Sequence, residues 1–328
     1  METRILTCGD ASSLERAVDE ACFLLSSGEV VGLPSETVYG LAGDALNPVA
    51  AARIFEAKGR PHFDPLICHL PDEGWLAQLT NILPEVRPLV DALAAAFWPG
   101  PLTMVLPKRE LVPDLVCSGL PTVAVRRSVH PVFSAVARHF GRPLAAPSAN
   151  RFGRISPTAA AHVLTELGGR IPLILDGGPT SHGLESTIVA PEKEGIRILR
   201  LGPVTREQLA EFASVRVCGE VGDERPEAPG QLKSHYAPAK PLRLLQAGEP
   251  VSGDTESAGL LAWRDGRDGF GAVEVLSKTG DLREAAANVF AALRRLDEGA
   301  WTQLYAELLP EEGLGAAVNE RLGRAAAR

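Results

Sequence analysis

Hydrophobic and polar positions alternate along the first two-thirds of the chain in the way of helices and strands that follow one another. The first pattern predicts a helix that Ser12 or Ser13 caps. Its apolar face consists of Leu14, Val18, Ala21, Leu24 and Leu25. The next apolar run, residues 30–33, predicts a strand that ends at Pro34.

The same alternation continues to about residue 205. Further strands are predicted at residues 66–70, 102–106, 122–125, 144–146, 171–175, 186–190 and 196–201. Further helices are predicted at residues 48–57, 75–79, 84–97 and 130–140, and one that begins at 156–158. The connections are short, so the pattern favours an α/β or α+β fold with a mixed, strongly twisted sheet.

The character of the chain changes at residues 216–241, where four prolines stand among Gly, Glu and Asp and exclude a helix. A second alternation follows, with strands at 242–245, 259–263 and 273–276, a helix from Asp281 and another over 314–327. We therefore predict a larger α/β domain over 1–210, a Pro-rich linker over 211–240, and a small α/β domain over 241–328.

Composition adds limits to this picture. A length of 328 residues suggests two domains, and a net charge of −8 argues against general attraction to nucleic acid or anionic membrane. The five cysteines are scattered without a CxxC pair, so a disulfide framework or a zinc site is not expected. The N-terminus has no signal-peptide pattern and no apolar run approaches about 20 residues. We expect a cytoplasmic protein without a membrane span.

Two neighbouring segments carry the strongest chemical signal. Residues 34–41 place hydroxyls and a carboxylate on a turn, and residues 58–66 place Lys58 and Arg60 on the Gly/Pro-rich exit of a helix. Cations there can meet phosphate or carboxylate oxygens, which predicts a site for a small anionic or zwitterionic ligand. Taken alone, a polar turn and a helix end with dipole-compensating cations explain the same residues. We expect the Lys58 side chain to be exposed to the cleft.

Other segments are open to two interpretations in the same way. His69 on an apolar strand is either a satisfied core histidine or a ligand. Residues 118–126 put hydroxyls before a strand and an arginine at its end, and residues 147–151 offer N–H groups that can hold an anion. Residues 183–189 also fit a simple hairpin.

The joint order of these motifs resembles the YrdC-type family, the L-threonylcarbamoyl-AMP synthases. The resemblance rests on Pro-Ser-Glu-Thr-Val-Tyr-Gly-Leu, Lys-Gly-Arg-Pro, Pro-Gly-Pro-Leu-Thr, Ser-Ala-Asn and Glu-Ser-Thr-Ile-Val, and covers about residues 10–205. Residues 228–238 resemble the linker of the longer, two-domain form. The resemblance as a whole implies a twisted mixed sheet with an open cleft and a smaller Rossmann-like C-terminal domain. Ser35 and Asp64 depart from the residues that are usual in the family, threonine and asparagine.

The resemblance implies a nucleotidyltransferase of tRNA processing. L-Threonine, bicarbonate and ATP would give L-threonylcarbamoyl-AMP and pyrophosphate, with magnesium bridging the phosphates. A partner threonylcarbamoyl transferase would then modify the adenosine beside the anticodon of tRNA, and weak direct RNA binding is a further expectation. No covalent protein nucleophile is required; positioning and charge stabilisation suffice.

The resemblance also implies roles for individual residues. Those that would hold threonine are Thr37, His69, Thr122, Ser148 and Ser186. Those that would hold the nucleotide are Arg60, Asp64, Ser118, Ala146, Ser148, Ser156, Arg200, His235 and Tyr236. Lys58, Arg60 and Arg126 would supply the positive charge that acts in catalysis. Lys233 and Ser234 stand beside His235 in the linker, which we expect to fold over the cleft as a lid.

Three other function classes use the same residues. A binding module for structured RNA would use the basic cleft without turnover, and pyrophosphate release that requires threonine and bicarbonate distinguishes the two. A carbamoyl-transfer enzyme of hydrogenase maturation shares the domain, but its cysteine-rich zinc fingers have no counterpart in this sequence. A regulatory or ribosome-associated role fits least, because nearly all substrate-contact positions are filled.

Overall fold

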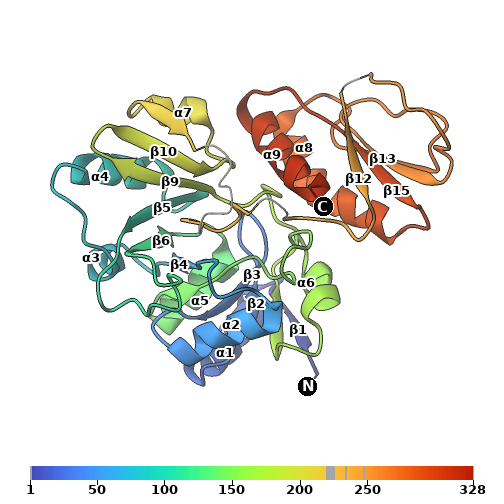
Figure 1. The fold of residues 1–328 in the computed structure, drawn as a ribbon. Coiled ribbons are helices and arrows are strands. Elements are labelled where there is room, and N and C mark those ends of the chain that lie inside the picture. Colours follow the sequence, from blue (N-terminus) through green and yellow to red (C-terminus); the bar gives the residue numbers. More distant parts are fainter. Residues whose placement is uncertain (1, 219–225, 233–234, 247, 328) are drawn as a thin grey trace.

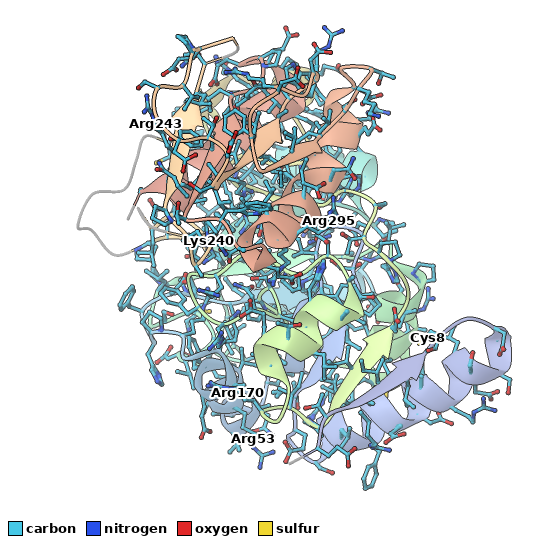
Figure 2. The ribbon with its side chains drawn as sticks, turned by 90° about the vertical axis from the view of Figure 1, so that its right-hand side faces the viewer. Cys8, Arg53, Arg170, Lys240, Arg243 and Arg295 are labelled. Atoms are coloured by element: carbon cyan, nitrogen blue, oxygen red, sulfur yellow. The ribbon has the colours of Figure 1, made fainter. Side chains whose placement is uncertain are left out.

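The structure is a computed structural model that describes residues 2–218, 226–232, 235–246 and 248–327. It consists of a large mixed α/β unit and a smaller C-terminal unit, which lie side by side (Figure 1). Viewed from the side, Lys240 lies near the junction of the two units, while Arg53 and Arg170 lie on the larger one (Figure 2).

The larger unit is built on an 11-stranded mixed sheet of order β1-β8-β2-β3-β7-β4-β6-β5-β9-β10-β11. Its strands are β1 (Arg4–Thr7), β2 (Val31–Leu33), β3 (Gly40–Asp44), β4 (Ile67–His69), β5 (Leu102–Pro107), β6 (Thr122–Arg126), β7 (Leu144–Ala145), β8 (Leu173–Asp176), β9 (Thr187–Glu192), β10 (Gly195–Arg200) and β11 (Val215–Val217). Its helices are α1 (Ala11–Ser26), α2 (Pro48–Lys58), α3 (Gly74–Leu79), α4 (Arg87–Phe97), α5 (Pro131–Phe140), α6 (Ala160–Leu167) and α7 (Arg206–Ala210).

The smaller unit is a four-stranded parallel sheet of order β12-β15-β13-β14. Its elements are β12 (Leu242–Leu245), β13 (Ala258–Ala262), β14 (Ala272–Val275), α8 (Leu282–Glu298), β15 (Gln303–Glu307) and α9 (Gly313–Ala326). The predicted fold class, a mixed twisted sheet followed by a small α/β domain, is confirmed.

Two sequence predictions about helix starts are wrong. The cap of α1 is Asp10, whose carboxylate accepts the Ser13 N–H while the Ser13 hydroxyl binds the Asp10 backbone. The helix predicted from 156–158 begins only at Ala160. Residues 157 and 158 remain outside the helix, and their carbonyls accept the N–H groups of Tyr39 and Thr180, which ties this segment to two others.

The two units share a hydrophobic core at their boundary. Val38, Ile155 and Leu184 of the larger unit pack in one cluster with side chains of α8 and α9, Phe290 and Leu322 among them. All are nearly inaccessible to solvent. The C-terminal helices therefore support the loops that follow β2 and precede β9, which also form the site described next.

Candidate active site

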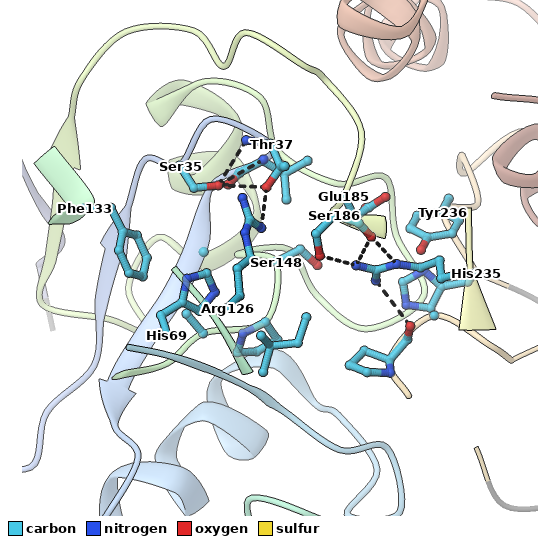
Figure 3. Close-up of a pocket in the computed structure, with 18 of the residues that line it drawn as sticks. Ser35, Thr37, His69, Arg126, Phe133, Ser148, Glu185, Ser186, His235 and Tyr236 are labelled. Atoms are coloured by element: carbon cyan, nitrogen blue, oxygen red, sulfur yellow. Dashed lines mark hydrogen bonds between the residues drawn. The ribbon is translucent and has the colours of Figure 1, made fainter. Parts of the chain in front are cut away.

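A pocket lies where the β2–β3 turn, the ends of β4 and β6, the loop after β7, the segment before β9 and residues 229–230 and 235–236 meet (Figure 3). It is lined by Ser35, Thr37, Val38, Gly40, Arg60, Ile67, His69, Arg126, Phe133, Ala146, Pro147, Ser148, Glu185, Ser186, Arg200, Pro229, Gly230, His235 and Tyr236. Segments far apart in the sequence thus place cations, hydroxyls and aromatic rings around one space.

At one end of the pocket an arginine is held by a carboxylate and a hydroxyl. Arg126 forms a buried ion pair with Glu36 and donates to Thr37 Oγ1 at 3.0 Å. Ser35 Oγ lies 2.9 Å from the same Thr37 oxygen. Burial raises the pKa of Glu36, but Arg126 and the Ser128 hydroxyl outweigh it and hold that pKa at about 2. This end is electrically balanced.

His69 lies at the same end, beside Phe133, with 4.5 Å between the ring centroids. Its Nδ1 atom is buried and has no hydrogen-bond partner among the described residues. Burial and the nearby Arg126 lower the pKa of His69 to about 3, so the imidazole is neutral near pH 7. A neutral ring with a free nitrogen can accept or donate one hydrogen bond to a ligand.

Lys58 contradicts the expectation of a cleft-exposed side chain, because it is only 2% exposed. Its Nζ donates to the backbone carbonyls of Ser148 and Asn150, which fixes the loop after β7. It forms no ion pair with any described residue. Burial, and next the neighbouring Arg60, lower the pKa of Lys58 well below its usual range.

Arg60 is also buried, but it has a partner. Its guanidinium pairs with Asp64 Oδ2 at 2.9 Å and donates to the carbonyls of Asp64 and Pro65 at 3.0 and 2.8 Å. Burial raises the pKa of Asp64, and Arg60 opposes that rise. The resemblance places the Asp64 carboxylate beside the nucleotide. Its negative charge is compensated by Arg60, four residues earlier in the sequence.

Arg200 lies at the other end of the pocket, and among the residues that the structure describes its guanidinium donates only to uncharged oxygens. It donates to the Ser186 carbonyl at 3.1 and 2.9 Å, to Ser186 Oγ at 3.1 Å and to the Pro229 carbonyl at 3.2 Å (Figure 3). Among the described residues it forms no ion pair. Burial lowers the pKa of Arg200 from its usual value, as expected for a cation without a carboxylate partner.

The linker contributes His235 and Tyr236 to this end. Their rings lie 4.2 Å apart between centroids, and Tyr236 stacks on Phe290 of α8 at 5.6 Å. Tyr236 has a φ of 63°, which turns the chain sharply before Ala237 pairs with the backbone at Gly153. The linker is thus bound to both units. Lys233 and Ser234 lie outside the described residues.

Most predicted site residues line the pocket: Thr37, Arg60, His69, Arg126, Ala146, Ser148, Ser186, Arg200, His235 and Tyr236. Three others contact lining residues: Lys58 binds Ser148, Asp64 pairs with Arg60, and Ser156 donates to Glu185. Thr122 lies at the opposite end of β6 from Arg126 and is not among the lining residues. Ser118 is not either, although its buried Oγ has no partner among the described residues.

Ser35, Glu36 and Glu185 take part in the site, although the sequence assigned none of them a substrate contact. All three stand inside the motifs on which the sequence analysis rests, so the signal was present. The roles of the two glutamates depend on long-range packing: Glu36 meets Arg126 of strand β6 across 90 positions of sequence, and Glu185 meets Arg321 of helix α9 across 136.

The described part of the chain holds no group of three or more His, Cys, Asp or Glu side chains that could bind a metal ion. None of its helices is long and apolar enough to cross a membrane. Buried cations, hydroxyls and a neutral histidine around one pocket instead define an α/β protein with a site for an anionic or zwitterionic small molecule.

Comparison with known proteins identifies the family. The model of the family described as "Telomere recombination" matches residues 24–202, and that of the threonylcarbamoyl-AMP synthase C-terminal domain matches residues 204–327. The threonylcarbamoyl-AMP synthase of Bacillus subtilis is 38% identical, over 97% of this chain and 95% of its own. That of Pyrococcus abyssi is 37% identical, over 93% and 92%.

A solved structure agrees with these matches. The crystal structure of P. abyssi Sua5 complexed with L-threonine superposes with a TM-score of 0.89 at 34% identity, over 99% of this chain and 98% of that one. The chain therefore belongs to the two-domain, YrdC-like threonylcarbamoyl-AMP synthases. It is a nucleotidyltransferase that carries out the first step of the threonylcarbamoyl-adenosine modification of tRNA.

Proposed function

We propose that the pocket binds L-threonine at the end with Thr37, His69 and Arg126, and ATP at the end with Arg60, Arg200, His235 and Tyr236. Ser148 and Ser186 lie between the two ends and would contact both substrates. The products are L-threonylcarbamoyl-AMP and pyrophosphate, and bicarbonate supplies the carbamate carbon. The threonine complex of the P. abyssi protein supports the amino-acid part of this proposal.

The observation that carries the nucleotide assignment is Arg200, a buried cation that lines the pocket and has no carboxylate partner among the described residues. Burying an uncompensated charge is costly, and proteins normally pair such groups. A triphosphate entering beside Arg200 would supply the missing negative charge, and Lys58 lies directly behind the lining residue Ser148. The positive charge of Arg60 is compensated by Asp64. Its remaining N–H groups would therefore orient the nucleotide by hydrogen bonding and would contribute less to electrostatic attraction.

The threonine end is suited to a zwitterion that carries a hydroxyl. Arg126 would face the carboxylate, and the Ser35 and Thr37 hydroxyls and the free Nδ1 of neutral His69 would face the polar groups. The apolar wall of Val38, Ile67 and Phe133 would receive the methyl group. Ser118 stays in the proposal as a nucleotide contact because its buried hydroxyl is unpartnered. Thr122 lies at the far end of β6 and does not line the pocket, so the structure gives no support for a ligand contact there.

The chemistry needs no covalent protein intermediate. The neutral threonine amine adds to carbon dioxide with loss of a proton, or to bicarbonate with loss of water, and gives a carbamate. A carbamate oxygen then attacks the α-phosphorus while pyrophosphate leaves. Lys58, Arg60 and Arg126 would hold the reactants and stabilise charge on the phosphate oxygens. The buried, hydrogen-bonded cations cost little reorganisation during the step.

Magnesium would arrive with ATP and bridge its phosphates. The lining carboxylate, Glu185, is bound by Ser156 and by Arg321, so it does not fit the role of a metal ligand. Under this proposal the protein recognises the phosphates with its cations, and the metal belongs to the substrate.

Within the linker predicted over 211–240, residues 215–217 form strand β11 of the large sheet, so this part does not act as a lid. His235 and Tyr236 would act as the lid: they would cover the nucleotide end and keep water from a carbamoyl adenylate that hydrolyses easily. A threonylcarbamoyl transferase would receive the product, and any contact with RNA would be weak, in line with the net charge of −8.

Two matched substitutions test the assignment of the two ends. Calorimetry on the full chain would measure the binding of L-threonine and of a non-hydrolysable ATP analogue to Thr37→Val and Arg200→Met. We expect Thr37→Val to weaken threonine binding and Arg200→Met to weaken nucleotide binding, each with little effect on the other ligand. The reverse pattern would show that the two ends are assigned the wrong way round.

A further inference from the structure

A buried arginine of the C-terminal domain reaches the wall of the pocket. Arg321 in α9 is 1% exposed, and its Nε donates to Glu185 Oε2 at 2.9 Å while its Nη2 donates to the Leu201 carbonyl at 2.7 Å. Its guanidinium also lies 5.3 Å from the centre of the Tyr236 ring. One side chain outside the catalytic domain thus contacts Glu185 and Tyr236, both of which line the pocket.

Glu185 connects this arginine to groups that we assign to the nucleotide. Its other oxygen, Oε1, accepts the hydroxyl of Ser156. The next residue, Ser186, holds the Arg200 guanidinium through its carbonyl and hydroxyl oxygens. Glu185 also acts electrostatically on Arg200, although the two form no ion pair in the described structure.

We propose that Arg321 is a positioning residue of the synthase: it occupies the Glu185 carboxylate, which keeps Arg200 free for the nucleotide and holds Ser156 and Tyr236 in place. The inference rests on the nucleotide assignment proposed above. It gives the C-terminal domain a direct part in building the site, in addition to covering apolar surface.

Removal of Arg321 would change the nucleotide end selectively. A buried Glu185 without its cation would attract Arg200, whose present partners are uncharged oxygens, and would draw it away from Ser186 and Pro229. The threonine end would change little, because Arg126 has its own carboxylate in Glu36.

Arg294 offers a matched control for simple domain docking. It too is a buried arginine of the C-terminal domain, in α8, and it bridges the units by donating to Glu166 at 3.1 Å and to the Ile155 carbonyl. Glu166 does not line the pocket. Loss of docking strength alone would therefore affect Arg294→Met and Arg321→Met alike.

The experiment measures calorimetric dissociation constants of the full chain for a non-hydrolysable ATP analogue and for L-threonine. We expect Arg321→Met to weaken analogue binding by ~10-fold or more, as for a lost charged hydrogen bond, while threonine binding and the Arg294→Met control stay near wild type. Adding Glu185→Gln to Arg321→Met should restore much of the analogue affinity, because the uncompensated carboxylate is then gone. If Arg321→Met does not fold, Arg321→Gln replaces it, because it also removes the cation and keeps hydrogen-bond donors, with the same expected direction.

Several results would overturn the inference. These are equal weakening of both ligands, the same loss in Arg294→Met, or no recovery on adding Glu185→Gln. The parallel variant Arg200→Met separates this failure from that of the function proposal. If Arg200→Met weakens analogue binding and Arg321→Met does not, only the inference is wrong; if neither does, the nucleotide assignment is wrong and the inference falls with it.

Discussion

At the end of the pocket that carries Thr37, the Arg126 guanidinium is paired with Glu36, whereas at the opposite end Arg200 contacts carbonyl and hydroxyl oxygens and no carboxylate of the described part of the chain. Both arginines are almost fully buried. The difference lies in the counter-charge. A balanced end suits a zwitterion such as an amino acid, and an end with unbalanced positive charge suits a polyanion.

This comparison shows how an acidic protein builds a positive site. The chain has a net charge of −8, yet Lys58 and Arg200 are buried without a carboxylate partner among the described residues. The lining carboxylate Glu185, which acts electrostatically on Arg200, is bound by Arg321 from the other domain. Positive charge is thus placed locally by keeping carboxylates away, and overall charge gives no indication of it.

The largest expected effect is on stability, and it comes from breaking the ion pair between Arg126 and Glu36. Arg126→Met leaves the Glu36 carboxylate buried without its cation and should lower the free energy of unfolding by about 3–5 kcal/mol. Arg200→Met removes an unpaired buried cation and should cost clearly less. Urea unfolding of both variants measures this, and equal losses would show that the two ends do not differ in charge balance.

The second prediction concerns the loss of stability of the folded protein at low pH. The pKa of Glu36 is about 2 in the folded protein and 4.5 ordinarily, so between these values the unfolded chain binds more protons. The stabilisation by Glu36 is complete above about pH 4.5 and lost as the pH falls to about 2, with a size of about 3 kcal/mol.

Unfolding free energies at pH values across this window, for wild type and Glu36→Gln, test the acid prediction. The variant should show a flatter decline, since it lacks the titrating group. An unchanged slope in the variant would assign the acid sensitivity of the protein to other groups.

The third prediction concerns turnover. Lys58→Met removes a buried cation beside the proposed reaction centre and should lower kcat by ~100-fold or more, as for one preorganised charge contact. Pyrophosphate release measures it. Arg53→Met is the matched control, because Arg53 lies on the same helix and pairs with Glu29 outside the pocket. Near-normal turnover in Lys58→Met would remove this lysine from the mechanism.

Sequence reasoning reached those elements whose hydrophobic period is clear. The helix predicted at 130–140 corresponds to α5, and the strands at 122–125 and 196–201 correspond to β6 and β10. The strand β3 was missed, because its Gly-Leu-Ala-Gly-Asp sequence has neither alternation nor β-branched residues, and every position is buried. Strands β1, β11 and β15 were missed as well.

For the site as well, local sequence patterns were sufficient for some features and long-range packing decided others. Motifs located the residues, because each motif is contiguous in sequence. Motifs do not tell which side chains pair, because the pairs Arg126–Glu36 and Arg321–Glu185 depend on sheet order and domain packing. The burial of Lys58 was missed for the same reason: its carbonyl partners come from a loop 90 or more positions away.

The smallest expected effect concerns the choice between threonine and serine, which differ by one methyl group. The proposed amino-acid end has an apolar wall of Val38, Ile67 and Phe133, and a methyl group in such a pocket is worth ~10-fold in kcat/KM. Phe133→Leu should reduce this preference by loosening the wall, while Arg200→Met, at the other end, should leave the ratio unchanged even if both rates fall. Competition between the two amino acids in pyrophosphate release measures the ratio directly. A preference that changes in Arg200→Met but not in Phe133→Leu would place the amino acid at the end now assigned to the nucleotide.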